Sequence, residues 1–383
     1  MSVTASRSLV VVSAGLSQPS STRLLADRLS AAVDRHLRAA GIEPQIEVIE
    51  LRDQAKDLVN NLLAGFPSPH LRAELDAVLA ADGLIAVTPI FSASYSGLFK
   101  LFFDLVERDG FAGKPVLIAA TGGTARHSLA LEHAMRPLFA YLNGAVVATA
   151  VYAATEDWGG GGDGRRSPGC GGARRMSTAA TRSLVVVSAG LSQPSSTRLL
   201  ADRLSAAVDR HLREAGTEPR IEVIELRDQA KDLVNNLLAG FPSPGLQAAL
   251  NAVLGADGLI AVTPIFSASY SGLFKLFFDL VERDGFAGKP VLIAATGGTA
   301  RHSLALEHAM RPLFAYLNAA VVATAVYAAT EDWGGGGVAA DGSLVGRIDR
   351  AALELSAAMA VRGPAAPKDA FADPVPFDQL LRS

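Results

Sequence analysis

The stretch SLVVVSAGLSQPSSTRLLADRLSAAVDRHLR, residues 8–38, decides the organisation of this 383-residue chain, because it recurs unchanged at residues 183–213. The match continues to Gly162 in the first copy and to Gly337 in the second, with few differences. A repeat of this length indicates two copies of one folding unit. Chain length points the same way, since a single core rarely organises more than about 250–300 residues.

Within each copy, short apolar runs alternate with longer amphipathic stretches. Apolar side chains from Leu25 to Leu37 recur at helical spacing, and similar one-sided patterns predict helices at 70–80 and 96–106. This alternation favours a parallel sheet covered on both faces, and five such strands predict a flavodoxin-like, three-layer α/β fold. In the first copy the five strands are expected at 9–12, 46–51, 83–87, 115–120 and 145–152.

The two copies differ in how they end. After the shared EDWGGGG the second copy continues with VAADGSLVGRIDRAALELSAAMAV, residues 338–361, whose apolar positions predict a closing helix. The first copy instead enters DGRRSPGCGGARR, residues 163–175, which has almost no apolar residues and is typical of a flexible linker. The expected organisation is a truncated first domain at 1–162, a linker at 163–182, a complete second domain at 183–362 and a flexible tail at 363–383.

Composition excludes several classes of function. With 35 Lys and Arg against 38 Asp and Glu, the formal net charge is -3, so no basic surface for nucleic acid is expected. The one cysteine, Cys170, has no disulfide partner and no neighbouring zinc ligands, which fits a reducing compartment. No run reaches the roughly 18 apolar residues that span a bilayer, and the N-terminus is not typical of a signal peptide. The sequence therefore predicts a cytoplasmic protein without a membrane partner or a metal.

Hydroxyl side chains crowd the turn after the first strand, where Ser17, Ser20, Ser21 and Thr22 stand at the start of a helix. A helix N-terminus offers unpaired N–H groups and a partial positive charge, so such a turn can hold a phosphate. One or two of these hydroxyls would be explained equally well as ordinary N-caps, whereas four favour an anion site. The turn lacks GxGxxG and GxxxxGK[ST], so a mononucleotide phosphate fits better than a dinucleotide or an ATPase site.

Two further loops follow strands of the same sheet. Pro89 to Phe91 follow the third strand, ahead of a helix whose apolar face belongs to the core, and Thr121 to Gly123 follow the fourth strand. Glycine lets a backbone approach a flat ligand closely, although a structural turn explains Gly-Gly equally well. Because the carboxyl ends of parallel strands share one edge of a sheet, all three loops are expected at one crevice.

The segments SQPSSTR, TPIFSASYSGLFKLFFDL and ATGGTARHSLALEHAMRPLFAYL together resemble the NAD(P)H-dependent FMN reductases, most closely those that supply flavin to alkanesulfonate and other luciferase-like monooxygenases. The resemblance covers nearly the whole of each copy. It implies that the FMN phosphate would be held by Ser17, Gln18, Ser20, Ser21 and Thr22. The isoalloxazine would border Pro89, Ile90, Phe91, Ser92 and Tyr95, and its pyrimidine edge would meet Thr121, Gly122 and Gly123. The counterparts in the second copy are Ser192, Gln193, Ser195, Ser196, Thr197, Pro264, Ile265, Phe266, Ser267, Tyr270, Thr296, Gly297 and Gly298.

Histidines near the third segment have other expected roles. In similar reductases the helix that would contain His133 and His308 contributes to an oligomer interface and can carry a bulge, so an interface role is expected for both. Paired metal ligands are not favoured, because His127 and His133 lack the i, i+4 spacing of such pairs on a helix. Arg126 and His127 could contact the pyridine nucleotide or form a solvated pair. The loop ATEDWGGGG after the fifth strand departs from the family and has no assigned role.

The resemblance implies reduction of FMN by NAD(P)H, with reduced flavin passed to a flavin-dependent monooxygenase. No catalytic side chain is expected, since hydride transfer between nicotinamide and flavin is the cofactors' own chemistry. Two alternatives stay open: a quinone or azo reductase that uses bound FMN, and a flavodoxin-type electron carrier, which the low net charge and the segment SYSGLFK disfavour. The two copies are expected to associate with each other or as a homo-oligomer. The choice between NADH and NADPH stays open.

Overall fold

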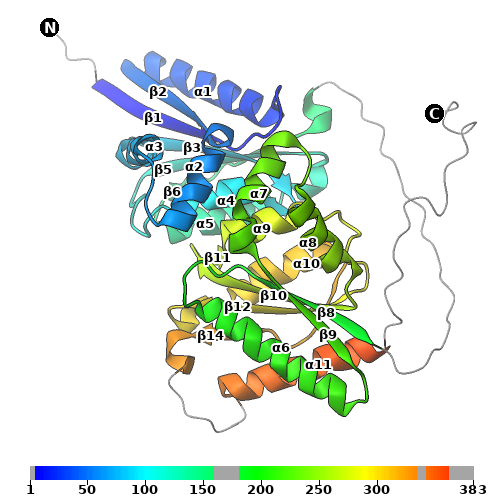
Figure 1. Ribbon diagram of the computed structural model, residues 1–383. Coiled ribbons are helices and arrows are strands. Elements are labelled where there is room, and N and C mark those ends of the chain that lie inside the picture. Colours follow the sequence, from blue (N-terminus) through cyan, green and yellow to red (C-terminus); the bar gives the residue numbers. More distant parts are fainter. Residues whose placement is uncertain (1–4, 159–180, 334–341, 362–383) are drawn as a thin grey trace, which may run out of the picture.

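The computed structural model describes residues 5–158, 181–333 and 342–361, in which the two copies form two α/β units (Figure 1). The first unit contains β1 (Ala5–Ser13), α1 (Ser21–Ala39), β2 (Ile42–Glu50), α2 (Leu51–Ala64), α3 (Pro69–Ala80), β3 (Gly83–Phe91), β4 (Ser94–Tyr95), α4 (Gly97–Phe103), β5 (Pro115–Gly122), α5 (Arg136–Tyr141), β6 (Ala145–Val146) and β7 (Val151–Ala154). The second contains β8 (Arg182–Ser188), α6 (Ser196–Glu214), β9 (Pro219–Glu225), α7 (Leu226–Ala239), α8 (Pro244–Gly255), β10 (Gly258–Phe266), β11 (Ser269–Tyr270), α9 (Gly272–Phe278), β12 (Pro290–Gly297), α10 (Arg311–Tyr316), β13 (Ala320–Val321), β14 (Val326–Ala329) and α11 (Leu344–Val361).

Both sheets have the strand order of a doubly wound, flavodoxin-like fold. The first runs β2-β1-β3-β5-β6 and the second β9-β8-β10-β12-β13, all parallel, with β7 and β14 continuing the last position. This is the order in which the second strand lies outside the first and the chain then winds the other way. The predicted fold class, with five parallel strand positions in each copy, is confirmed.

Three local features differ from the expectation. The fifth strand, predicted at 145–152, divides into β6 and β7, and in between the Arg136 guanidinium donates to the carbonyl oxygens of Val147 and Ala148 at 3.0 and 3.2 Å. The two-residue β4 adds an antiparallel hairpin to β3. Helix α2 was not anticipated, since it follows β2 without any intervening turn residue.

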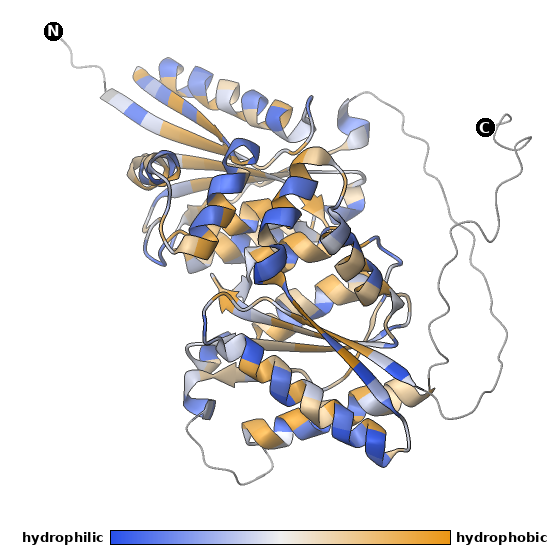
Figure 2. Cartoon of the chain, viewed as in Figure 1, coloured by the Kyte–Doolittle hydropathy of each residue, from blue (hydrophilic) through white to orange (hydrophobic). Residues whose placement is uncertain are grey.

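Side chains of the first sheet alternate between two apolar clusters. Val10, Val12 and Leu84 face α2, α3 and α4, whereas Leu9, Val11 and Ile85 face α1. In the second unit the face toward α6 is also covered by α11, whose Leu344, Ile348, Leu355 and Met359 are buried as the closing-helix prediction requires. Figure 2 shows apolar strands between helices that are polar toward the outside. Among residues 5–158 no helix takes the place of α11.

The two units pack against each other through equivalent surfaces. Helix α4 lies against α9 and α2 against α7 (Figure 1). The Gly97 amide donates to Asp279 Oδ2 and the Gly272 amide to Asp104 Oδ2, each at 2.7 Å. One apolar cluster runs through both units. The interface is therefore isologous, like that of a two-fold homodimer made within one chain.

Two expected segments cannot be compared with this fold. The linker expected at 163–182 lies outside the described residues except for its last two, and Arg182 already begins β8. The tail expected at 363–383 lies entirely outside them.

Candidate functional site

The turn between β1 and α1 presents free donors at the N-terminus of a 19-residue helix. Ser20 is the N-cap, and its Oγ accepts from the Arg23 amide at 3.2 Å, which leaves the hydroxyl hydrogen of Ser20 free to donate. Ser17 and Ser21 are exposed beside it. The first turn of α1 contains no acidic residue, so the positive end of the helix dipole is not neutralised there. The N-cap interpretation is thus right for Ser20 and still compatible with an anion site.

A hydroxyl pair joins this turn to the loop after β5. Thr22 Oγ1 and Thr121 Oγ1 lie 2.8 Å apart, and both side chains are nearly inaccessible to solvent. Because each hydroxyl has one hydrogen and only one of them lies between the two oxygens, the pair keeps one donor for a third group. Thr197 and Thr296 repeat the contact at 2.8 Å in the second copy.

The three strand-end loops of the first copy meet at one cavity of about 420 Å³. Ten of the predicted residues line this loop pocket: Ser17, Ser20, Ser21, Thr22, Pro89, Ile90, Phe91, Thr121, Gly122 and Gly123. The loop after β5 needs glycine, because a Cβ at Gly122 would overlap the hydroxyl of Tyr152, which donates to the Thr124 carbonyl at 2.8 Å. A Cβ at Gly123 would meet nothing within 4 Å, so the backbone at this position is open to the pocket.

Two further lining residues come from the segment that had no assigned role. Thr155 and Trp158 belong to a short 3-10 turn after β7, and both face the loop pocket. Asp157 fixes this turn by accepting from the Ala154 amide at 2.8 Å, and the Arg28 guanidinium lies 4.7 Å from the Trp158 ring centre. Their position at the carboxyl end of the fifth strand was the signal that could have identified them.

Three predicted residues of the first copy lie elsewhere. Gln18 lines a neighbouring cavity of about 320 Å³, together with Arg23 and Glu50. Ser92 and Tyr95 line a cavity of about 590 Å³ between the two copies, and so do Ser267 and Tyr270. Ser92 lies in the turn of the β3–β4 hairpin and Tyr95 is the last residue of β4, so both are separated from the loop pocket. The flavin contact expected for them stays a prediction.

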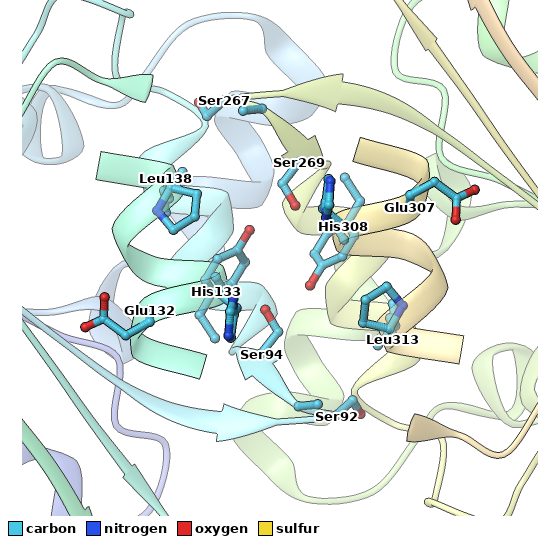
Figure 3. Close-up of a pocket in the computed structure, with 18 residues that line it drawn as sticks. Ser92, Ser94, Glu132, His133, Leu138, Ser267, Ser269, Glu307, His308 and Leu313 are labelled. Carbon is cyan, nitrogen blue, oxygen red and sulfur yellow. The ribbon is translucent and has the colours of Figure 1, made fainter. Parts of the chain in front are cut away.

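The cavity between the copies also contains His133 and His308, which lie on opposite sides of it (Figure 3). Both are part of π-helical turns, Leu131–Met135 and Leu306–Met310, which correspond to the expected bulge. Glu132 also lines this cavity, and its carboxylate, which is turned outward in Figure 3, pairs with Arg136. This placement agrees with an interface role for both histidines.

His127 is likewise an interface residue. Its ring lies 5.7 Å from that of Tyr316 in the second copy, and His302 makes the reciprocal contact with Tyr141 at 5.7 Å. Within the described residues, no group of three or more His, Cys, Asp and Glu side chains could hold a metal ion. The same part of the chain has no helix with the length and apolar character needed to cross a membrane.

Comparison with known proteins identifies the family. The model of the family described as NADPH-dependent FMN reductase matches residues 8–159 and 182–334. The chain is 38% identical over 150 residues to an FMN reductase (NADPH) of Pseudomonas aeruginosa, across 39% of this chain and 78% of the relative. It is 37% identical over 150 residues to the NADH-dependent FMN reductase SfnF of Pseudomonas fluorescens, with the same two coverages of 39% and 78%. A solved oxidoreductase structure from Corynebacterium diphtheriae is 43% identical, with a TM-score of 0.46 over 49% of this chain and 100% of that one. The chain belongs to the NADPH-dependent FMN reductase family and is an NAD(P)H:FMN oxidoreductase.

Proposed function

We propose that each copy binds FMN in its loop pocket and that the reduced flavin leaves for a separate flavin-dependent monooxygenase. The carrying observation is the convergence of three strand-end loops on the α1 N-terminus, where the hydroxyls of Ser17, Ser20 and Ser21 have hydrogens to donate. A phosphate matches this donor set, because the first turn of α1 has no acidic residue and a helix N-terminus favours an anion. The backbone at Gly122 and Gly123 offers a flat approach for a ring.

The residues of this chain would bind and orient the flavin rather than react with it. FMN held here would supply the redox chemistry, which is hydride transfer from a nicotinamide. The Thr22–Thr121 pair holds the phosphate turn and the glycine loop in a fixed relation, which is the positioning that such a reaction needs. Trp158 lines the same pocket and would border a bound flavin.

Passage of reduced flavin to a monooxygenase requires FMN to exchange with solvent. The exposure of Ser17 and Ser21 favours exchange, because the phosphate end would not be enclosed. The resemblance to reductases that serve luciferase-like monooxygenases supports the same partner. A bacterial luciferase supplied with oxygen, a long-chain aldehyde, NAD(P)H, FMN and this chain should emit light. Some light should remain when a dialysis membrane separates the two proteins, in proportion to the free reduced FMN that crosses before oxygen oxidises it.

The proposed site is tested by Ser20→Ala, Thr22→Ala, Ser195→Ala and Thr197→Ala together. FMN affinity, measured by fluorescence titration, should fall by well over tenfold, because hydrogen bonds to charged groups contribute roughly 1.5–3 kcal/mol each. Ser68→Ala with Ser243→Ala is a matched control: it removes the N-caps of α3 and α8, which accept at 3.1 and 3.2 Å, away from the pocket. Unchanged FMN affinity in the quadruple variant would reject the site.

Steady-state rates with FMN, FAD or a quinone as acceptor separate this proposal from a quinone reductase. Saturation by free FMN, with the quinone reduced only when FMN is also present, supports release of the flavin. Equal quinone reduction by protein that retains FMN through gel filtration would contradict it.

A further inference from the structure

A fully buried lysine from each copy reaches into the other copy. Lys275 Nζ donates to the carbonyl oxygen of Phe91 at 2.9 Å, and Lys100 Nζ donates to that of Phe266, also at 2.9 Å. Both lysines have no exposed surface. Each ammonium also pairs with a carboxylate on its own helix, Asp279 or Asp104.

One of the two accepting residues, Phe91, belongs to the loop pocket, and Phe266 is its counterpart in the second copy. Phe91 is the last residue of β3 and lines that pocket with Pro89 and Ile90. The next two residues, Ser92 and Ala93, have φ angles of 46° and 61°. Two consecutive non-glycine residues in the left-handed region raise the free energy of the folded state. Such a backbone conformation persists only where neighbouring contacts enforce it. The ammonium of Lys275 supplies such a contact immediately before the turn.

The rest of each ion pair reinforces the same junction. Asp279 Oδ2 accepts from the Gly97 amide at 2.7 Å, so one Lys–Asp pair of the second copy binds the first copy on both sides of the β3–β4 hairpin. A Cβ at Gly97 would overlap the backbone of Leu276, so the close approach requires glycine. Burial lowers the pKa of Lys275 and raises that of Asp279, and their mutual attraction opposes both shifts.

A buried ion pair is weak support for stability, because desolvation of two charges offsets most of their attraction. Its placement here gives it another role. On the basis of the flavin site proposed above, we propose that Lys275 is a positioning residue for the loop that follows β3 in the first copy. Lys100 has the same role for the loop that follows β10 in the second copy. Each site then depends on a lysine supplied by the opposite copy.

Copy-specific FMN titrations test this crossed dependence in the full chain. Ser196→Asp places a carboxylate at the first residue of α6, where it suits the helix dipole but repels a phosphate, so only the first-copy site remains. In this background Lys275→Met should raise the FMN dissociation constant at least tenfold. Lys100→Met is the matched control, because Lys100 belongs to the same copy as the measured site. The factor by which it raises the FMN dissociation constant should be at least three times smaller. In the Ser21→Asp background the order of the two lysine variants should reverse.

Two outcomes would overturn the inference: an equal effect of both lysine variants, or a larger effect of the lysine from the same copy. If Lys275→Met does not fold, Lys275→Met with Asp279→Asn avoids an unpaired buried charge, and Lys100→Met with Asp104→Asn is its control. Failure of the proposed site is distinguishable, because Ser21→Asp with Ser196→Asp would then leave FMN binding intact. If the lysines had a purely structural role, each lysine variant would lower the melting temperature, and its effect on the FMN dissociation constant would be the same in the Ser196→Asp and Ser21→Asp backgrounds.

Discussion

The same sheet face is covered in the second copy and open in the first. Val208, Leu212 and Leu292 are 0% exposed beneath α11, whereas their counterparts in the first copy are only half-buried. A hollow of about 520 Å³ occupies this place between α1 and the sheet. It is lined by Arg7, Ser8, Leu9, Val33, Leu37, Asp82, Gly83, Leu84, Ile85, Pro115, Leu117 and Val147.

The difference extends to polar groups at the rim. Asp257 and Arg182 are buried next to α11, while Asp82 and Arg7 are exposed. Since the residues of the two faces are nearly identical, their unequal burial comes from α11 and not from the sheet sequence. Burial is thus a property that a neighbouring element confers on a given side chain.

The largest expected effect concerns the separate copies. Met176–Ser383 should form a soluble homodimer through its α7 and α9 surfaces and reduce FMN at a rate per site at least equal to that of the full chain. Met1–Gly162 should aggregate. Loss of a helix that buries roughly 500 Å² of apolar surface forfeits about 12 kcal/mol gross, and the net stability of a domain is only about 5–15 kcal/mol.

Expression of both fragments followed by size-exclusion chromatography checks this expectation. Their boundaries follow the domain division proposed from the sequence. An N-terminal fragment that is soluble, cooperative in melting and fully active would show that α11 is dispensable.

A matched pair of substitutions measures the two faces within the full chain. Leu212→Ala should lower the free energy of unfolding by about 2–5 kcal/mol, as for a fully buried leucine. Leu37→Ala should cost less than about 1.5 kcal/mol, because Leu37 is half-buried at the hollow. Urea unfolding gives both values. Equal costs would mean that the first-copy face is covered in solution.

A glycine pair reports on contact with α11 itself. A Cβ at Gly258 would lie 2.5 Å from Met359 Sδ, whereas one at Gly83 would meet nothing closer than Leu9 Cδ1 at 3.4 Å. Gly258→Ala should therefore destabilise by about 1–2 kcal/mol, and Gly83→Ala by less than about 0.5 kcal/mol. A neutral Gly258→Ala, measured by thermal melting, would contradict the packing of Met359.

The smallest effect depends on pH and on one position where the copies differ. Glu74 of the first copy corresponds to Ala249, and burial raises the pKa of Glu74 to about 6. The folded state then binds more protons than the unfolded state between pH 4.5 and 6, so its stability falls as pH rises through this window. The free energy of unfolding of Glu74→Ala, relative to that of the natural chain, should rise by about 1 kcal/mol between pH 4.5 and 7, after allowance for solvent screening. A constant difference in urea unfolding across these pH values would refute the shift.

Much of this organisation is readable from the sequence, because strand order and loop position follow from the alternation of apolar runs. The loops after β1, β3 and β5 were found in this way, and the structure brings them together. Thr155 and Trp158 were missed because no residue-type signal marks them, although their place at a strand end does.

Contacts between the copies were harder to predict, because a linear pattern does not distinguish a core within one unit from a core shared by two. Every residue of α4 is buried, Lys100 included. A helix that is apolar on all sides must be covered on all sides, so this pattern was the available signal for the interface. Tyr95, two residues before α4, also faces the other copy, where its ring centre lies 6.2 Å from that of Tyr270.

The sites themselves lie at the strand ends, away from the open face, and the threonine pairs are 2.8 Å apart in both copies. We therefore expect two FMN sites per chain, each controlled by its own helix N-terminus. Titration of the full chain with FMN, followed by flavin fluorescence, tests this most directly. Two molecules should bind per chain, one in Ser21→Asp, one in Ser196→Asp and none in the double variant. Two tightly bound FMN molecules in the double variant would contradict the account.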